Sequence, residues 1–291
     1  MNKLGIDIGG TFIKWAIFNK DNKIIKRGKI DSNLDTADNS RDFKDVMSDL
    51  IYFINELNKE FKLEYIGFSL PGAIDTKNKK ISWSGINTKS ASGFNLGHEV
   101  EKRTGIRTEL INDANAGALG EVHEGAAKGY DDAVVIVIGT GIGSGIVINK
   151  EILIGQYFFG GEIGQIPWTD NKPLEQHISA HYFLKKVNSK LNTNMDGVEF
   201  FSKLKNNKAI QKYYFEWIDE ISKMIVTLNW ILDPQIFILG GGVIDNPLFK
   251  ISDIENSLPK FLDKKLVKNI KIKKAKLGSD AQLYGAVNII K

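Results

Sequence analysis

The sequence predicts an α/β protein built from two related domains. Strand-like apolar runs alternate with helical patterns along its 291 residues, the order typical of α/β folds. Residues 4–19 and 134–149 share one form, an apolar run, a glycine turn and a second apolar run, and matching residues lie 130 positions apart. β-Branched residues around a glycine-rich turn predict a β-hairpin. Two hairpins half a chain apart indicate two domains of one design, although such strings also arise by coincidence.

The expected elements follow in chain order. Residues 42–61 carry apolar residues at helical spacing, and residues 65–70 form a short apolar strand that ends at a Pro-Gly turn. The longest helix is expected over 210–232, where Asp233-Pro234 ends it. The remaining expected elements are helices over 95–104 and 113–128, strands over 108–111, 235–239 and 270–277, and a final helix capped by Ser279-Asp280.

Composition excludes several classes of protein. The net charge is +4. The densest basic stretch, 268–276, alternates lysine with apolar residues, which is typical of a strand with one solvent-exposed face. A nucleic-acid partner is therefore not expected. Cysteine is absent, which excludes disulfides and thiolate metal sites and fits a reducing compartment. No targeting segment stands at the N-terminus and the apolar run 133–138 is too short for a bilayer, so we expect a cytoplasmic protein without a membrane partner.

Two glycine turns have the composition of phosphate-binding loops. One follows Asp7 and the other spans Gly139 to Gly143. Glycine lets successive backbone N–H groups point outward and form a nest for an anion, so two opposed turns suit phosphate. Asp7 can hold Mg²⁺, directly or through water, against phosphate oxygens. Each turn taken alone is more typical of an ordinary hairpin, and Asp7 taken alone is more typical of a hydrogen-bonding group at a strand end.

Three further segments carry polar groups that suit chemistry. Gly240 to Gly242 follow a buried strand, where glycine admits a nucleotide base or ribose, or serves close strand–helix packing. Asn112 and Asp113 end a strand and open a helix, where a carboxylate can act as a general base or simply cap the helix. Glu162 and Glu175 can accept hydrogen bonds from sugar hydroxyls, or lie solvated in loops. Neither GxGxxG nor a GxxxxGK[ST] loop is present.

These segments together resemble the ROK family of sugar kinases, which has an actin-like, ribonuclease H-like ATPase fold. The resemblance covers nearly the whole chain and rests on DIGGT at 7–11, NDANAGALGE at 112–121, IGTGIGSGI at 138–146, GGEIGQ at 160–165 and ILGGGV at 238–243. It implies duplicated domains with a cleft between them. The expected lobes are a small one, 1–113 plus 280–291, and a large one, 114–279.

The resemblance also implies a role for each matching residue. Asp113 is expected as the catalytic base. The first phosphate loop is expected from Asp7, which also holds Mg²⁺ through water, with Gly9, Gly10, Thr11 and Lys14. The second phosphate loop is expected from Gly139, Thr140, Gly141 and Gly143. The adenosine contact is expected from Gly240, Gly241 and Gly242. The sugar contacts are expected from Gly72, Asn87, Asn112, Asp113, Glu162, Gln165 and Glu175.

The sequence departs from the family pattern in one segment. Most members carry GEIGH followed by a CxCGxxGCLE zinc segment, whereas here Gln165 replaces the histidine and residues 166–174 contain no cysteine. Zinc is therefore not expected, and the family's sugar preference does not carry over. Zinc-less members include some N-acetylmannosamine kinases and β-glucoside kinases. ROK repressors carry a helix-turn-helix before the first phosphate loop, and since only six residues precede Asp7 we expect none here.

The expected function is ATP- and Mg²⁺-dependent phosphorylation of a hexose or hexose derivative at O6, with Asp113 as general base. The candidate sugars are glucose, N-acetylmannosamine and a β-glucoside. The first alternative is a non-catalytic sugar sensor of the same family. The second is another actin-like ATPase, such as a filament protein or chaperone, against which Glu162 and Glu175 count. The resemblance implies a homodimer.

Overall fold

The protein forms two compact units, each with its own sheet and core. The computed structural model describes residues 2–34, 41–85 and 90–289. The first unit comprises Met1–Gly125, Ile152–Gly160 and Ser279–Lys291, and the second comprises Ala126–Glu151 and Gly161–Gly278. The lobe boundaries expected from the sequence, after residue 113 and before residue 280, stay a prediction.

The first unit is built on a five-stranded sheet with strand order β3-β2-β1-β4-β7. β1 pairs antiparallel with β2 and parallel with β4, and β4 pairs parallel with β7. The carboxyl ends of these three parallel strands therefore meet at one edge of the sheet. The strands are β1 (Asn2–Ile8), β2 (Phe12–Phe18), β3 (Ile24–Asp31), β4 (Leu63–Leu70) and β7 (Arg107–Asn112).

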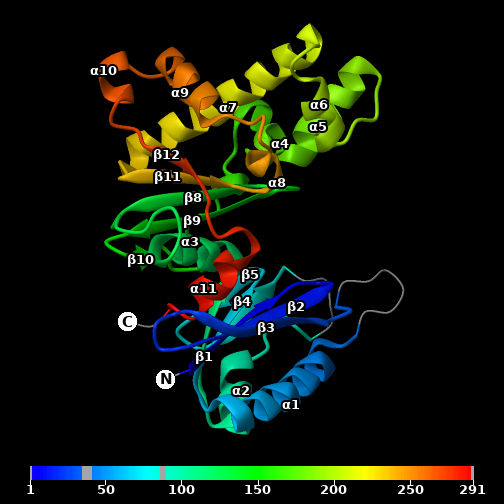
Figure 1. The fold of residues 1–291 in the computed structure, drawn as a ribbon, viewed down its shortest axis with the longest axis vertical. Coiled ribbons are helices and arrows are strands. Elements are labelled where there is room, and N and C mark those ends of the chain that lie inside the picture. The colour runs from blue at the N-terminus through cyan, green and yellow to red at the C-terminus, as the bar shows by residue number, and fades with distance from the viewer. Residues whose placement is uncertain (1, 35–40, 86–89, 290–291) are drawn as a thin grey trace. The chain divides into compact units, whose positions relative to one another are not determined.

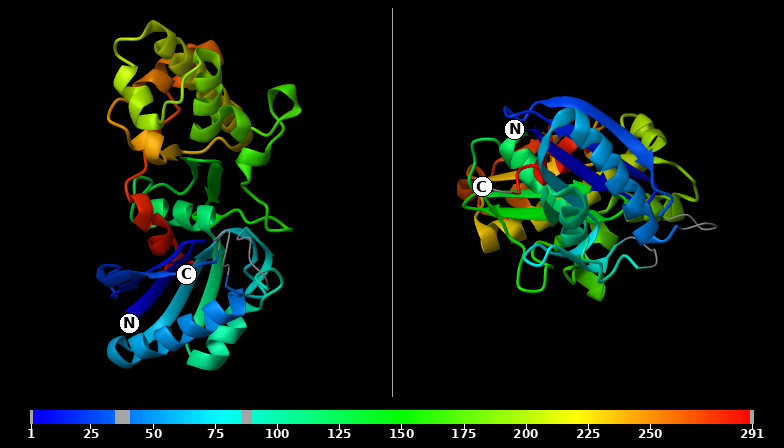
Figure 2. Two further views of the ribbon diagram at one scale, coloured as in Figure 1. Left: turned by 90° about the vertical axis from the view of Figure 1, so that its right-hand side faces the viewer. Right: turned by 90° about the horizontal axis from the view of Figure 1, so that it is seen from below.

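Helices cover both faces of the first sheet (Figures 1 and 2). On one face, α1 (Phe43–Phe61) and α2 (Leu96–Thr104) pack on alternate side chains of β1, including Leu4 and Ile6. On the other face, α11 (Ala281–Ala286) packs on β2 and β4 and lies against α3 (Asp113–His123). A small two-stranded sheet, β5 (Gly72–Asp75) with β6 (Lys80–Ser84), follows β4.

The second unit repeats the same sheet, with strand order β10-β9-β8-β11-β12. As in the first sheet, the two strands of the hairpin, β8 and β9, pair antiparallel. β11 then pairs parallel with β8, and β12 pairs parallel with β11. The duplication predicted from the two hairpins is therefore confirmed. The strands are β8 (Ala133–Ile138), β9 (Ile142–Ile148), β10 (Glu151–Ile152), β11 (Ile236–Gly240) and β12 (Ile272–Lys274).

The two hairpins differ by one residue at the turn. Ile8 pairs with Ile13 in the first hairpin, whereas Ile138 pairs with Ile142 in the second. The second turn is thus one residue shorter than the first. The second strands of the two hairpins therefore match at an offset one residue smaller than the 130 positions read from the sequence.

The helices of the second unit pack on one face of its sheet (Figure 1). The long helix α7 (Lys208–Leu232) buries Tyr214 and Trp217 in an aromatic cluster with Phe183 of α5 and Phe200 of α6. The other helices are α4 (Glu175–Ile178), α5 (Ala180–Leu191), α6 (Gly197–Lys203), α8 (Gly242–Asp245), α9 (Ile251–Ser257) and α10 (Lys264–Val267). The short 3-10 helices are η1 (Ile163–Gln165), η2 (Thr169–Asn171), η3 (Leu258–Lys260) and η4 (Gly278–Asp280).

Three sequence expectations about elements need correction. The strand expected over 270–277 is shorter, because only β12 forms there. β11 ends at Gly240, so the chain beyond Ala275 has no strand to pair with. The helix expected over 113–128 ends at His123. Asp280 occupies the N-cap position of α11 but makes no capping bond, because its carboxylate pairs with Arg27 at 2.9 Å.

Glycine lets α11 approach its neighbours closely. A Cβ on Gly285 would lie 1.7 Å from the carbonyl oxygen of Ala116, and one on Gly120 would lie 2.2 Å from that of Ala281. Backbone oxygens cannot move aside as a flexible side chain does, so both positions require glycine. The packing of α3 on α11 therefore depends on backbone contact.

Gly120→Ala should lower the free energy of unfolding by about 1–3 kcal/mol, because its methyl group overpacks this contact. Gly117→Ala is the matched control, since it lies on the same helix and a Cβ there meets nothing within 4 Å. That control should be neutral or stabilising by up to about 1 kcal/mol, as alanine is the better helix former. Urea unfolding of both variants measures the difference. Equal stabilities would contradict the packing account.

Candidate functional site

A row of polar side chains crosses the first sheet beside the first glycine turn. Asp7 near the end of β1 is in register with Ser69 of β4 on one side and Lys14 of β2 on the other. The Ser69 hydroxyl donates to Asp7 Oδ1 at 2.8 Å, and Lys14 Nζ lies 3.9 Å from Asp7 Oδ2. Lys14 is in turn in register with Lys29 of β3. The Lys14 ammonium thus lies beside the Asp7 carboxylate, and the Lys29 ammonium lies over the Phe12 ring.

The first turn keeps backbone donors available for an anion. Its carbonyl groups are used: the Ser32 hydroxyl donates to the Gly10 carbonyl at 2.6 Å, and the Leu34 N–H donates to it at 2.9 Å. Within the part of the chain that the structure describes, the N–H groups of Gly10 and Thr11 donate to no protein acceptor. Consecutive N–H groups of this kind form an anion nest.

Asn112 and Asp113 make different contacts at the start of α3. The side-chain oxygen of Asn112 caps the helix by accepting the Asn115 N–H at 3.1 Å, and its amide donates to the carbonyl oxygen of Gly72 at 3.1 Å. The Asp113 carboxylate accepts the Ala114 N–H at 2.8 Å. The capping alternative thus applies to Asn112, and Gly72 and Asn112 lie together as two of the expected sugar contacts.

Burial raises the pKa of the Asp7 and Asp113 carboxylates. For Asp113, loss of hydration raises the pKa, and hydrogen bonds from the Ala114 N–H and its own backbone only partly offset it. For Asp7, loss of hydration raises the pKa more than the Ser69 hydrogen bond and Lys14 lower it, and the charge of Asp113 raises it further. Each carboxylate is a stronger base than a hydrated one. Perturbed groups of this kind gather at functional sites.

The second glycine turn lines a pocket of about 370 Å³ in the second unit. Gly139 and Gly242 both lie on its wall, so the second turn and the third glycine cluster share one cavity. Its volume falls in the range of small-molecule sites. The complete lining is Ile138, Gly139, Ala180, Leu184, Asp196, Gly197, Val198, Phe201, Gly242, Val243 and Asn246.

Backbone contacts hold this pocket together. The Ala180 N–H at the start of α5 donates to the Gly139 carbonyl at 2.9 Å. Gly241 has a φ of +108°, and a Cβ there would lie 2.2 Å from the carbonyl oxygen of Ile138, so only glycine fits. As in the first turn, the Thr140 and Gly141 N–H groups have no protein acceptor among the described residues.

Glu175 lies beside the second turn. A Cβ on Gly141 would be 2.8 Å from Glu175 Oε2, so this carboxylate packs over the turn. Glu162 precedes η1 at its N-cap position and Gln165 ends it, and the Ser144 hydroxyl on β9 donates to the Gly161 carbonyl at 2.5 Å. Asn87, also expected at the sugar, lies outside the described residues.

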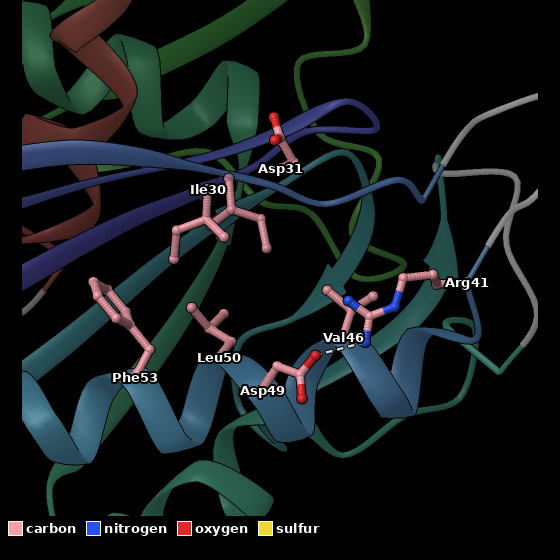
Figure 3. Close-up of a pocket in the computed structure, with 8 residues that line it drawn as sticks. Ile30, Asp31, Arg41, Val46, Asp49, Leu50 and Phe53 are labelled. Atoms are coloured by element: carbon pink, nitrogen blue, oxygen red, sulfur yellow. Dashed lines mark hydrogen bonds and ion pairs between the residues drawn. The ribbon is translucent and has the colours of Figure 1, made fainter.

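A second pocket, in the first unit, contains none of the predicted residues. It has a volume of about 230 Å³ and lies between α1 and the β2–β3 hairpin. Figure 3 shows Leu50 and Phe53 of α1 facing Ile30, with the Arg41–Asp49 ion pair at one end. It is separate from the polar row that contains Asp7.

Sequence reasoning missed three residues of these sites. Ser69 is fully buried within the buried run 65–70 of β4, and a hydroxyl inside such a run is itself a sign of a partner nearby. Asp196 and Asn246 line the pocket of the second unit, but nothing local distinguishes them from ordinary loop residues. Only the fold brings them to Gly139.

The residues around Asp7 fit a magnesium ion that takes most of its ligands from phosphate oxygens and water. No cluster of three His, Cys, Asp or Glu side chains that suits a metal occurs among residues 2–34, 41–85 and 90–289. Magnesium is commonly bound by one or two carboxylates together with phosphate oxygens and waters. Asp7, which lies beside a turn with open N–H groups, suits that mode.

Comparison with known proteins places the chain among sugar-related proteins. A family model described as "ROK family" matches residues 3–291. The chain is 28% identical to a glucokinase of Thermotoga maritima over 99% of the chain and 96% of that protein. It is 25% identical to a xylose repressor of Bacillus subtilis over 99% of the chain and 76% of the repressor. A Streptomyces griseus ROK glucokinase solved with glucose and AMPPNP has a TM-score of 0.77 at 23% identity, over 99% of both chains.

Asp113→Asn should stabilise the fold near neutral pH. Because burial raises the pKa of Asp113 above 3.8, the wild-type protein loses stability as pH rises from that value through the folded-state pKa. The variant has no carboxylate to ionise, so its advantage should be larger at pH 7.5 than at pH values near ~4.5. Urea unfolding at both pH values measures it. Asp45→Asn, in the exposed first turn of α1, is the control, and an equal response of the two variants would contradict the burial account.

Proposed function

The chain belongs to the ROK family, and from that premise we propose that it is a sugar kinase that transfers the terminal phosphate of ATP to a hexose or hexose derivative. It has the actin-like ATPase fold of ROK sugar kinases, with two sheets of the same topology. Among the described residues, no helix combines the length and apolar character needed to cross a bilayer. The observation that carries the proposal is the 370 Å³ pocket, where two independently predicted glycine segments line one cavity.

The pocket of the second unit suits adenosine. Leu184, Val198 and Phe201 offer an apolar surface for a base, and Asp196 and Asn246 offer polar atoms for a ribose or base edge. Gly139 on the pocket wall begins the turn whose open N–H groups suit phosphate. A nucleotide bound here would thus have apolar contacts at one end and backbone donors at the other.

The polar row of the first unit suits the reacting end of the nucleotide. The Gly10 and Thr11 N–H groups and the Lys14 ammonium supply positive charge for phosphate oxygens. Asp7 would hold Mg²⁺ through water, and the bound ion would neutralise charge that develops on the transferred phosphoryl group.

Asp113 is the proposed general base. Its carboxylate would take the proton from the sugar hydroxyl, most simply O6, while that oxygen forms a bond to the terminal phosphorus. The bond from that phosphorus to the bridging oxygen of ADP breaks, and the proton later leaves Asp113 to water. The raised pKa of Asp113 makes this carboxylate a better proton acceptor. Asn112, Glu162, Gln165 and Glu175 are the proposed contacts to the other hydroxyl groups.

A non-catalytic sugar sensor is the second candidate, and the similarity to a xylose repressor favours considering it. Asp7 and Asp113 count against it, since a sensor has no need for two partly dehydrated carboxylates beside a phosphate-type turn. A coupled assay of ADP release with glucose, N-acetylmannosamine and methyl β-glucoside separates the candidates. Sugar-stimulated ADP release supports a kinase, sugar binding without ADP release supports a sensor, and ADP release that ignores sugar contradicts both.

Asp113→Asn should lower kcat by about 10²–10⁴-fold, because a general base contributes roughly that much to proton transfer. The KM for the sugar should change little, since the amide keeps the size and one acceptor oxygen of the carboxylate. Steady-state kinetics with the preferred sugar test this, with Asp45→Asn as a control that should behave as the wild type. A variant with near-normal turnover would rule out Asp113 as the base.

A further inference from the structure

Residues 166–174 occupy the place where most family members bind zinc, and they do not suit that metal. The chain has no cysteine, and no group of three potential ligands is found in the ranges that the structure describes. This segment nevertheless joins η1, which follows Glu162 and ends at Gln165, to α4, which begins at Glu175. Something other than a metal must fix the connection between these proposed sugar contacts.

The segment folds as a tight hairpin. Pro167 and Pro173 form an antiparallel bridge, the Trp168 N–H donates to the Lys172 carbonyl at 2.8 Å, and the Leu174 N–H donates to the Ile166 carbonyl at 2.9 Å. Asp170 at the tip has a φ of 58°, a left-handed conformation that aspartate tolerates better than most residues. The backbone therefore closes on itself without any metal.

Two side-chain contacts tie this hairpin to helices. The Trp168 indole N–H donates to Glu220 Oε2 on α7 at 2.8 Å, and His177 Nε2 on α4 lies 3.0 Å from Asp170 Oδ1. Lys223 donates to the other oxygen of Glu220 at 2.9 Å. We call the four residues Trp168, Glu220, Asp170 and His177 the clasp.

The charge on Glu220 makes its bond to Trp168 a strong one. Burial alone would raise the pKa of Glu220, but the hydrogen bonds from Trp168 and Lys223 outweigh burial and hold the pKa below its ordinary value. Glu220 is therefore an anionic acceptor at neutral pH, and hydrogen bonds to charged acceptors are roughly twice as strong as neutral ones.

The same helix also anchors α4. The Trp217 indole N–H donates to the Ile178 carbonyl at 2.7 Å, at the end of α4. Trp217 and Glu220 lie three residues apart, hence on one face of α7. That face thus holds the hairpin at one point and α4 at another, and Glu175 lies between the two points of attachment, packed over Gly141.

We propose that the clasp positions Glu175 and the η1 segment for sugar binding, the task that zinc performs in family members with the cysteine segment. The inference rests on the proposed function, since it takes Glu162, Gln165 and Glu175 as sugar contacts. Trp168 and His177 are positioning residues: they act through the backbone that carries Glu175. Sugar binding should therefore depend on an indole hydrogen bond and resist metal chelators.

Trp168→Phe tests the clasp, because it keeps an aromatic ring but removes the donor to Glu220. The KM for the preferred sugar should rise about tenfold to a hundredfold, with kcat and the KM for ATP within about twofold, as expected for loss of one bond to a charged acceptor. Trp230→Phe, at an exposed position on the same helix as Glu220, is the control and should leave the KM for sugar unchanged. An unchanged KM for sugar in Trp168→Phe would overturn the proposal, as would loss of sugar affinity in the wild type on treatment with EDTA in the absence of nucleotide.

Asp170→Asn gives a second reading if Trp168→Phe folds poorly. Asparagine tolerates the left-handed backbone at this exposed tip but has no carboxylate to contact His177 or to pair with Lys172, whose Nζ lies 2.9 Å from Asp170 Oδ2. A KM for sugar raised by about twofold to threefold supports the clasp, and an unchanged value counts against it.

Hydrogen exchange separates failure of the clasp from failure of the proposed function. If the wild type phosphorylates none of the three sugars, the kinase proposal fails, and exchange at the amides of Glu175 to Ile178 then decides whether the clasp holds α4. Faster exchange in Trp168→Phe than in Trp230→Phe supports the clasp, and equal rates overturn it.

Discussion

The candidate site of the first unit depends on the burial of two carboxylates at the edge of the sheet where the parallel strands end. Burial raises the pKa of Asp7 and of Asp113. Ionisation of either carboxylate therefore lowers the stability of the fold. The backbone contact of α3 with α11 at Gly120 and Gly285 fixes the helix that begins at Asp113. A looser helix would admit water, and the carboxylate would lose the basicity that the proposed chemistry uses.

Duplication supplies the second requirement, a glycine turn in each unit. Both sheets have the same strand order, so each places a hairpin turn after its first strand. Gly10 and Gly141 each lie in a turn whose N–H groups stay open for an anion. The two copies have since diverged: the first turn is flanked by Asp7, whereas the second has Glu175 packed against it and an apolar pocket beside it.

Much of this architecture was predictable from local pattern, because period and turn chemistry act over a few residues. The hairpins and α7 are of that kind, whereas the close approach of Gly241 to the Ile138 carbonyl depends on the fold. The clasp was not predictable, because Trp168 and Glu220 are 52 positions apart and each is unremarkable in its own segment. Likewise Asp280 has the composition of a cap, and only the folded chain brings it to Arg27 instead. The choice of sugar depends on contacts between distant segments that no local pattern encodes.

The most direct measurement of the central claim is a crystal structure of the protein with AMPPNP, Mg²⁺ and the sugar that stimulates ADP release. The account predicts that the Gly10 and Thr11 N–H groups contact the terminal phosphate and that Asp113 lies about 2.6–3.2 Å from the accepting hydroxyl. The adenine would occupy the pocket lined by Leu184 and Phe201. A phosphate chain bound away from both glycine turns, or Asp113 turned away from the sugar, would contradict it.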